Sequence, residues 1–107
     1  QWTTSDVVYN RERTLGGPAW ESDLAVWRKQ SPFYRSTKLT TPILLTVGEK
    51  DFRVPLNNTL EFWTVLQRQG VPSRLVVFPD ENHWVLKGEN SRYHYQVIQD
   101  WFARYLQ

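Results

Sequence analysis

Two short apolar segments place the tightest constraint on how these 107 residues can fold. The first, Ile43–Val47, is interrupted only by Thr46, so both of its alternating faces are mostly apolar. That pattern is typical of a strand that helices cover on both faces of a parallel sheet. The second segment, Arg74–Phe78, follows after a helix-length stretch and ends before Pro79. This order predicts an α/β fold in which two parallel strands are joined by a right-handed crossover helix.

The segments between and after the strands carry the periodicity of helices. We expect Asn57 or Asn58 to cap a helix that runs through Leu60 and Trp63 as far as Gly70. The chain then passes into the second strand, so this helix is the predicted crossover.

A final helix is expected after the second strand. Ser91 is its predicted cap, and Tyr93, Val97 and Trp101 fall on one apolar face. His94 lies within this pattern, so we interpret it as a helix-surface or packing residue.

The N-terminal part of the chain gives weaker signals. Residues 1–17 are polar and predicted to be irregular, and a short helix is expected over residues 19–29. Trp20, Leu24 and Trp27 are spaced four and three residues apart, which predicts one apolar helix face with both tryptophans in the core.

Composition excludes several classes of function. The 13 basic and 11 acidic side chains are interspersed and give a net charge of +2, which argues against nucleic-acid binding. The absence of cysteine excludes disulfides, thiolate metal sites and a cysteine nucleophile in these residues. The longest apolar run, Ile43–Val47, is far shorter than the ~20 residues that span a bilayer, so no membrane helix is expected. These features fit a cytoplasmic, periplasmic or secreted location equally.

The loops that follow the two predicted strands are the best candidates for a functional site. Carboxyl ends of parallel strands meet at the same edge of a sheet, so residues 48–55 and 79–90 should emerge side by side. The first loop contains Asp51 and the second contains His83. A carboxylate that holds one imidazole nitrogen leaves the other to act as a base, and imidazole ionises near working pH. We therefore predict an Asp51–His83 couple at this edge.

Other residues in these loops compete for a role. Glu49, Asp80 and Glu81 are alternatives to Asp51 as the acid. The other interpretation of each is a solvated loop charge or a partner for Arg53 or Lys50. Arg53 is interpreted as bracing its own loop, with binding of a substrate carboxylate as the alternative. The two histidines lack the short spacing of a zinc site, so no metal is expected. Trp84 is close enough to His83 in sequence to line a pocket.

The order of an acid followed by a histidine agrees with α/β-hydrolases, whose triad runs serine, acid, histidine along the chain. The serine of those enzymes lies in a Gly-x-Ser-x-Gly turn, which does not occur here. No serine here has flanking glycines, and five of the six are interpreted as loop or cap residues: Ser5, Ser31, Ser36, Ser73 and Ser91. The first residues have neither an initiator Met nor a signal pattern, so we expect the nucleophile upstream of residue 1, in a longer chain.

The sequences of two segments resemble segments of one enzyme family. Gly48-Glu49-Lys50-Asp51-Phe52-Arg53-Val54-Pro55 resembles the acid loop of the prolyl oligopeptidase family of serine peptidases. Gly70-Val71-Pro72-Ser73-Arg74-Leu75, followed by Phe78-Pro79-Asp80-Glu81-Asn82-His83-Trp84-Val85-Leu86-Lys87, is similar to the histidine segment of its dipeptidyl-peptidase V and acylaminoacyl-peptidase branch. The interval from Asp51 to His83 also fits. The resemblance covers roughly residues 16–107 and is looser before residue 16.

The resemblance implies that residues 1–107 are the C-terminal portion of an α/β-hydrolase peptidase domain, incomplete as given. It implies that Asp51 is the triad acid and His83 the general base, that no cofactor is needed, and that the substrates are short peptides. The partners that it implies are the remainder of the hydrolase domain and an upstream β-propeller, and an oligomer is compatible with it. Two alternatives stay open: an esterase or lipase of the same fold, and an inactive fragment that serves as a structural or interaction module.

Overall fold

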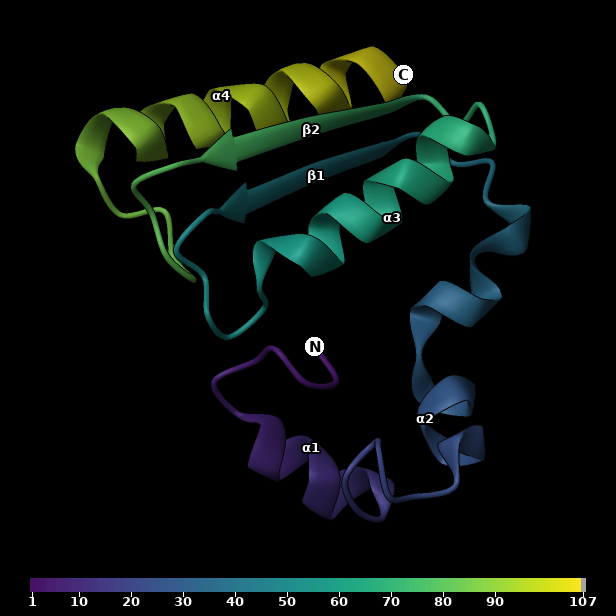
Figure 1. Ribbon diagram of the computed structural model, residues 1–107. Helices are drawn as coiled ribbons and strands as arrows, with labels where there is room; N and C mark the ends of the chain where they lie inside the picture. Colours follow the sequence, from purple (N-terminus) through teal and green to yellow (C-terminus); the bar gives the residue numbers. More distant parts are fainter. Residues whose placement is uncertain (107) are drawn as a thin grey trace.

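Two parallel strands form the centre of the molecule (Figure 1). In the computed structural model, which describes residues 1–106, β1 (Ile43–Gly48) and β2 (Ser73–Phe78) make a two-stranded parallel sheet. The register pairs Ile43 with Ser73 at one end and Gly48 with Phe78 at the other. Both predicted strands and their parallel pairing are confirmed. The loops after Gly48 and Phe78 consequently leave the sheet at the same edge.

Helices cover both faces of this sheet, as the apolar strand pattern predicts. The crossover helix α3 (Leu56–Arg68) lies along one side, and α4 (Gly88–Tyr105) lies along the other (Figure 1). Thr46 and Phe78, which share a face of the sheet, contact α4 through His94. The α/β layering is therefore confirmed, although each strand keeps one open edge, and Val77 is still 37% exposed.

The predicted helix caps are wrong by about one turn. Helix α3 begins at Leu56, so Asn57 and Asn58 lie inside its first turn, and the Asn58 side-chain amide donates to the carbonyl of Pro55. Helix α4 begins at Gly88, and the backbone N–H of Ser91 donates to the carbonyl of Lys87 at 2.8 Å.

The reason lies in the segments that precede each helix. Proline has a fixed φ that suits the entry to a helix, and Pro55 occupies the cap position of α3. Before α4, the carboxylate of Glu81 accepts the backbone N–H groups of Leu86 and Lys87, which fixes the chain just ahead of the helix. Because Glu81 lies seven residues before Gly88, the sequence next to the helix start contains no residue that marks it as a cap.

The first forty residues form the N-terminal arm, which lies beside α3 and the loop between β1 and α3 (Figure 1). Residues 8–15, predicted to be irregular, form the helix α1 (Val8–Leu15), which ends at Gly16 in the left-handed conformation with φ +86°. That φ favours glycine because a Cβ would be strained there. Pro32–Lys38 form a 3₁₀ segment, η1.

The predicted helix over residues 19–29 is shorter than expected. Helix α2 (Leu24–Gln30) begins only after Asp23, whose carboxylate accepts the N–H of Ala25 at 2.9 Å. Trp20 therefore lies outside the helix and is 64% exposed, so its prediction as a core residue is wrong. Trp27 is 1% exposed and packs edge-on against Trp2 with ring centroids 5.5 Å apart, which confirms it as core.

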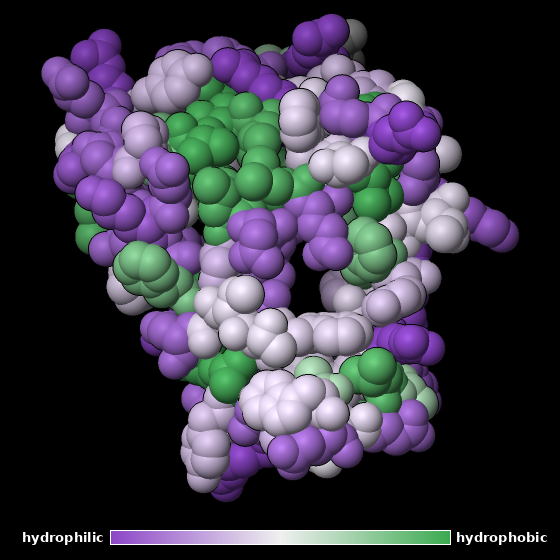
Figure 2. Space-filling model, viewed as in Figure 1, coloured by the Kyte–Doolittle hydropathy of each residue, from purple (hydrophilic) through white to green (hydrophobic). Residues whose placement is uncertain are grey.

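The buried apolar side chains come from both parts of the chain: Trp27, Val47, Leu66, Val71, Phe78 and Val97. Figure 2 shows apolar side chains gathered over the sheet in the upper half of this face, bordered by polar side chains. Within residues 1–106, no helix combines the length and the apolar character needed to cross a membrane.

Candidate active site

The loop after β1 holds a buried carboxylate. Asp51 is 7% exposed and follows Gly48 by three residues. Its Oδ1 atom accepts the backbone N–H groups of Arg53 at 2.9 Å and Val54 at 2.8 Å. These two bonds fix the carboxylate, because a buried oxygen keeps its bonding partners when no water can replace them. Its other oxygen, Oδ2, is directed at the neighbouring loop.

That neighbouring loop supplies a histidine. Nδ1 of His83 lies 2.9 Å from Oδ2 of Asp51, and the His83 side chain is 42% exposed. An ionised carboxylate only accepts hydrogen bonds, so Nδ1 is the protonated ring nitrogen and donates to it. Nε2 then carries the lone pair. Within residues 1–106 this is the one hydrogen bond of the His83 ring. Nε2 therefore keeps its lone pair available to accept a proton from another group.

Backbone contacts hold the two loops together. The N–H of Glu49 donates to the carbonyl of Phe78, and the N–H of Lys50 donates to the carbonyl of Glu81, both at 2.9 Å. Gly48 is buried, and a Cβ on it would lie 2.2 Å from the carbonyl oxygen of Asn82. The loops therefore approach each other as closely as only a glycine permits.

A cavity of about 170 Å³ opens at this junction. Its lining combines charged side chains of both signs with two exposed aromatic rings, those of Phe52 at 69% and Trp84 at 64% exposure. The ring centroid of Trp84 lies 5.3 Å from that of His83 in an edge-on arrangement. The lining residues are Asp6, Lys50, Asp51, Phe52, Arg53, Asn82, His83 and Trp84.

The remaining acids of the loops are not hydrogen-bonded to His83. Glu49 is exposed. Asp80 pairs with Lys87, and hydrogen bonds from Lys87 and Asn90 lower the pKa of its carboxyl group. Glu81 is buried and bonds along its own loop. Of the four candidate acids, Asp51 is the one that the structure brings to His83.

Arg53 has a bracing role, but its side chain braces the acid loop against the N-terminal arm and not, as expected, against its own loop. Its Nε donates to Oδ1 of Asp6 at 2.7 Å, and its NH2 group donates to Oδ2 at 3.3 Å. This hydrogen bond lowers the pKa of Asp6 and raises that of Arg53. The N–H of Asp6 donates to the carbonyl of Phe52, and the hydroxyl of Ser5 donates to that of Arg53, both at 2.7 Å.

A sequence model of the prolyl oligopeptidase family matches residues 1–107. This chain belongs to the prolyl oligopeptidase family. It is 34% identical over 109 residues to Dipeptidyl-peptidase 5 of Porphyromonas gingivalis, which covers 99% of this chain and 16% of that protein. It is 35% identical over 111 residues to Dipeptidyl-peptidase 5 of Schizosaccharomyces pombe, covering 97% of this chain and again 16% of the relative. The chain thus spans about a sixth of the length of these curated relatives.

Solved structures give the fold of this prolyl oligopeptidase family member. An acylaminoacyl peptidase of Pyrococcus horikoshii superposes with a TM-score of 0.85 at 24% identity, covering 98% of this chain and 18% of that one. An acylaminoacyl peptidase in complex with Z-Gly-Gly-Phe-chloromethyl ketone gives a TM-score of 0.85 at 25% identity, with the same coverage. The layered strands and helices described here are therefore part of an α/β-hydrolase fold.

The second histidine of this family member has a different setting. Nε2 of His94 lies 3.1 Å from the hydroxyl oxygen of Thr46, and its ring packs edge-on against Phe78 with centroids 5.7 Å apart. His94 is thus a packing residue between α4 and the sheet, as predicted. Among residues 1–106, no group of three or more His, Cys, Asp or Glu side chains is arranged to hold a metal ion.

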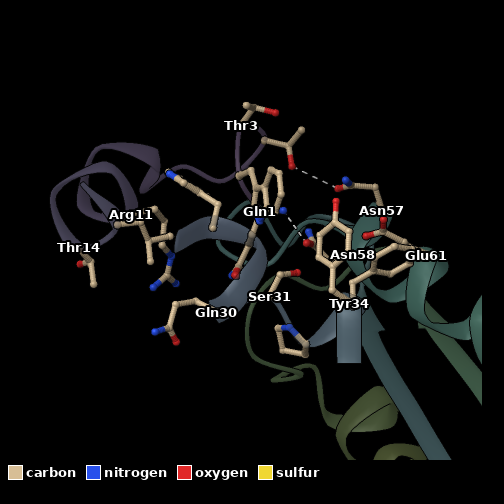
Figure 3. A pocket seen from close by; sticks show the side chains of 16 residues that line it. Gln1, Thr3, Arg11, Thr14, Gln30, Ser31, Tyr34, Asn57, Asn58 and Glu61 are labelled. Atoms are coloured by element: carbon tan, nitrogen blue, oxygen red, sulfur yellow. Dashed lines mark hydrogen bonds between the residues drawn. The ribbon is translucent and has the colours of Figure 1, made fainter. Parts of the chain in front are cut away.

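Sequence reasoning missed the contribution of the N-terminal arm. Asp6 lies 47 residues from Arg53 in the chain, and no spacing pattern links an isolated Ser-Asp pair to a distant loop. A larger cavity, of about 470 Å³, lies between the elements of this arm and the start of α3 (Figure 3). Its lining includes Arg11, Tyr34 and Glu61 but neither Asp51 nor His83.

Proposed function

We propose that this chain supplies the acid and the general base of a serine peptidase, with Asp51 as the acid and His83 as the base. The observation that carries the proposal is the 2.9 Å contact between Oδ2 of Asp51 and Nδ1 of His83. The buried carboxylate holds the ring in one tautomer and orientation, and the ring is half-exposed, with no hydrogen bond from Nε2 within residues 1–106. Membership in the prolyl oligopeptidase family supports these roles.

The nucleophile of the proposed reaction is a serine from a part of the protein outside these 107 residues, because no Gly-x-Ser-x-Gly turn occurs here. Nε2 of His83 takes the proton of the serine hydroxyl as its oxygen attacks the peptide carbonyl carbon. His83 then gives that proton to the leaving amine as the C–N bond breaks. Water attacks the acyl-enzyme by the same route, with His83 as base, and releases the acid and the free serine.

We propose short peptides as the substrates, cleaved in the manner of a dipeptidyl- or acylaminoacyl-peptidase. The support is the set of relatives, which carry the names Dipeptidyl-peptidase 5 and acylaminoacyl peptidase. The place of residues 1–107 within the hydrolase domain, the upstream β-propeller and an oligomeric assembly stay predictions of the family resemblance.

The test uses the full-length protein and two substrates, a chromogenic dipeptidyl amide and a simple ester. We expect His83→Ala and Asp51→Asn each to lower kcat on the amide by on the order of 10⁴. His94→Gln is the matched control, because it alters the other histidine without touching the couple, and its kcat per folded molecule should stay close to wild type. Labelling by a fluorophosphonate probe should require the upstream serine.

Three results would reject the proposal. A His83→Ala enzyme with near-normal turnover would remove His83 from the chemistry. Hydrolysis of the ester with no turnover of any peptide amide would identify an esterase of the same fold. If neither substrate is turned over and the probe does not label the full-length protein, the structural or interaction role is favoured.

A further inference from the structure

The loop that carries His83 contains a second buried carboxylate, that of Glu81, to which the proposed reaction gives no role. Glu81 is 4% exposed. Its Oε2 accepts the N–H of Leu86 at 3.1 Å, and its Oε1 accepts the N–H of Lys87 at 2.9 Å and the side-chain amide of Asn90 at 2.8 Å. These bonds reach from the start of the loop to its end, so they close it around His83.

The backbone of Glu81 has a separate set of contacts. Its carbonyl accepts the N–H of Lys50, the residue immediately before Asp51, at 2.9 Å. Its carbonyl also lies so close to Gly48 that a Cβ there would approach it to 2.6 Å. A single residue, two positions before His83, is thus fixed both to the acid loop and to the far end of the histidine loop.

A buried carboxylate needs compensating hydrogen bonds, because removing a charge from water is unfavourable. Here three N–H donors provide them, and bonds to an ionised acceptor are stronger than neutral ones. The amide of Asn90 makes the largest contribution, and together with the two backbone N–H groups it lowers the pKa of Glu81. The carboxylate therefore stays ionised at neutral pH and keeps all three donors in place.

We propose that Glu81 is a positioning residue for His83: it holds the loop closed so that Nδ1 meets Asp51 and Nε2 faces the incoming serine. This inference rests on the proposed function of the Asp51–His83 couple. Residues 79–87 belong to no strand or helix, so the loop has no ladder of its own to define the place of its histidine. Misplacement of a reacting group by ~1 Å lowers a rate by about 10²-fold.

The test compares Glu81→Ala, Glu81→Gln and Glu89→Gln in the full-length enzyme. Glu89→Gln is the matched control, because it removes the same charge from an exposed side chain at the start of α4. We expect Glu81→Ala to lower kcat per probe-labelled active site by about 10²-fold with little change in KM. Glu81→Gln keeps the shape and one accepting oxygen, so it should retain more activity than the alanine variant, and Glu89→Gln should match wild type.

A spectroscopic measurement separates positioning from folding. The proton on Nδ1 of His83, held by Asp51, should give a far-downfield proton resonance in wild type. That resonance should broaden or vanish in Glu81→Ala and persist in Glu89→Gln. If Glu81→Ala does not fold, Glu81→Gln carries the test, and reduced kcat with a weakened resonance is expected. Normal kcat per labelled site and an intact resonance in a Glu81 variant, even with a lowered unfolding midpoint, would overturn the proposal. If wild type lacks peptidase activity, the proposed function fails instead, while the resonance still reports on Glu81.

Discussion

The acid loop and the histidine loop are built in the same way but put their buried carboxylates to different uses. Asp51 is 7% exposed and Glu81 is 4% exposed, and each accepts two backbone N–H groups from its own loop. The third partner differs. Asp51 meets the imidazole of His83, whereas Glu81 meets the amide of Asn90. Both carboxylates are therefore buried and hydrogen-bonded, and only the third partner distinguishes them. The imidazole that Asp51 contacts can take part in proton transfer, whereas the amide that Glu81 contacts cannot.

The span of these bonds also differs between the loops. Asp51 accepts N–H groups two and three residues ahead, so the acid loop shapes itself locally. Glu81 accepts N–H groups five and six residues ahead, so its bonds close a longer stretch of chain than those of Asp51. Its side chain is one methylene longer than that of Asp51. The position of His83 consequently depends on a closure between distant residues, while Asp51 is held by its nearest neighbours.

Among the changes that test this comparison of the two loops, Gly48→Ala is expected to lower stability and kcat most, because both loops meet at Gly48. The new Cβ would lie 2.2 Å from the carbonyl oxygen of Asn82 and 2.6 Å from that of Glu81, so backbone must move. Forcing extra atoms into packed structure destabilises by about 1–3 kcal/mol. We expect a lower thermal midpoint of the full-length protein, measured by calorimetry, and a lower kcat of the proposed amide hydrolysis.

Gly88→Ala is the matched control for that variant. A Cβ at Gly88 meets no atom within 4 Å, and the residue opens helix α4. Replacing a glycine in a conformation that alanine adopts stabilises by restricting the unfolded chain. Its midpoint should stay level or rise. A Gly48→Ala enzyme that behaves like Gly88→Ala would show that the loops do not depend on their close approach.

The sequence predicts the central part of this fold because its signals are local and strong. A nearly continuous apolar run at Ile43–Val47, followed by a helix-length segment and a second strand, leaves few topologies. Topology alone then brings the loops of Asp51 and His83 to one edge, as the structure has them. Their catalytic roles stay a prediction, since geometry shows the couple and not the reaction.

Apart from helix α2 and the buried Trp27, the N-terminal arm could not be predicted from the sequence, for a physical reason. Helix α1 has no buried residue, so it lacks the apolar stripe by which helices are recognised. Trp20 matched a helical spacing, but the helix begins only at Leu24, after its cap Asp23. The contact of Asp6 with Arg53 and the loop closure by Glu81 are also invisible, because a single acid in a loop has the same sequence signature whether solvated or bonded.

A smaller effect is expected from acid, which acts on the Glu81 closure. The folded state lowers the pKa of Glu81 below its ordinary value of 4.5, so the unfolded chain binds the proton first. The stability that its ionisation contributes is present above that pH and is lost as pH falls through the lowered pKa. The gap in unfolding midpoint between wild type and Glu81→Gln should be constant near neutrality and shrink below pH 4.5. Other carboxyl groups titrate in both proteins and cancel, so a gap that stays constant into strong acid would contradict this origin.

The smallest effects are expected from the exposed ion pairs, of which each loop has one. Asp6 pairs with Arg53 on the acid loop, with side chains 44% and 49% exposed, and Asp80 pairs with Lys87 on the histidine loop, at 46% and 57%. Exposed pairs contribute little because water and salt screen them and two long side chains must be ordered. Asp6→Asn and Asp80→Asn should each shift the unfolding midpoint far less than Gly48→Ala, and added salt should shrink the shift further.

Activity distinguishes the two ion pairs. Asp51 is held by N–H groups of its own loop, so losing the Asp6–Arg53 pair should leave kcat near wild type. Asp80 shares the Asn90 amide with Glu81, so Asp80→Asn leaves that amide to Glu81 and should also keep kcat. A large loss of kcat in Asp6→Asn alone would mean that the acid loop depends on the N-terminal arm, and that the local bonds of Asp51 do not suffice to hold it.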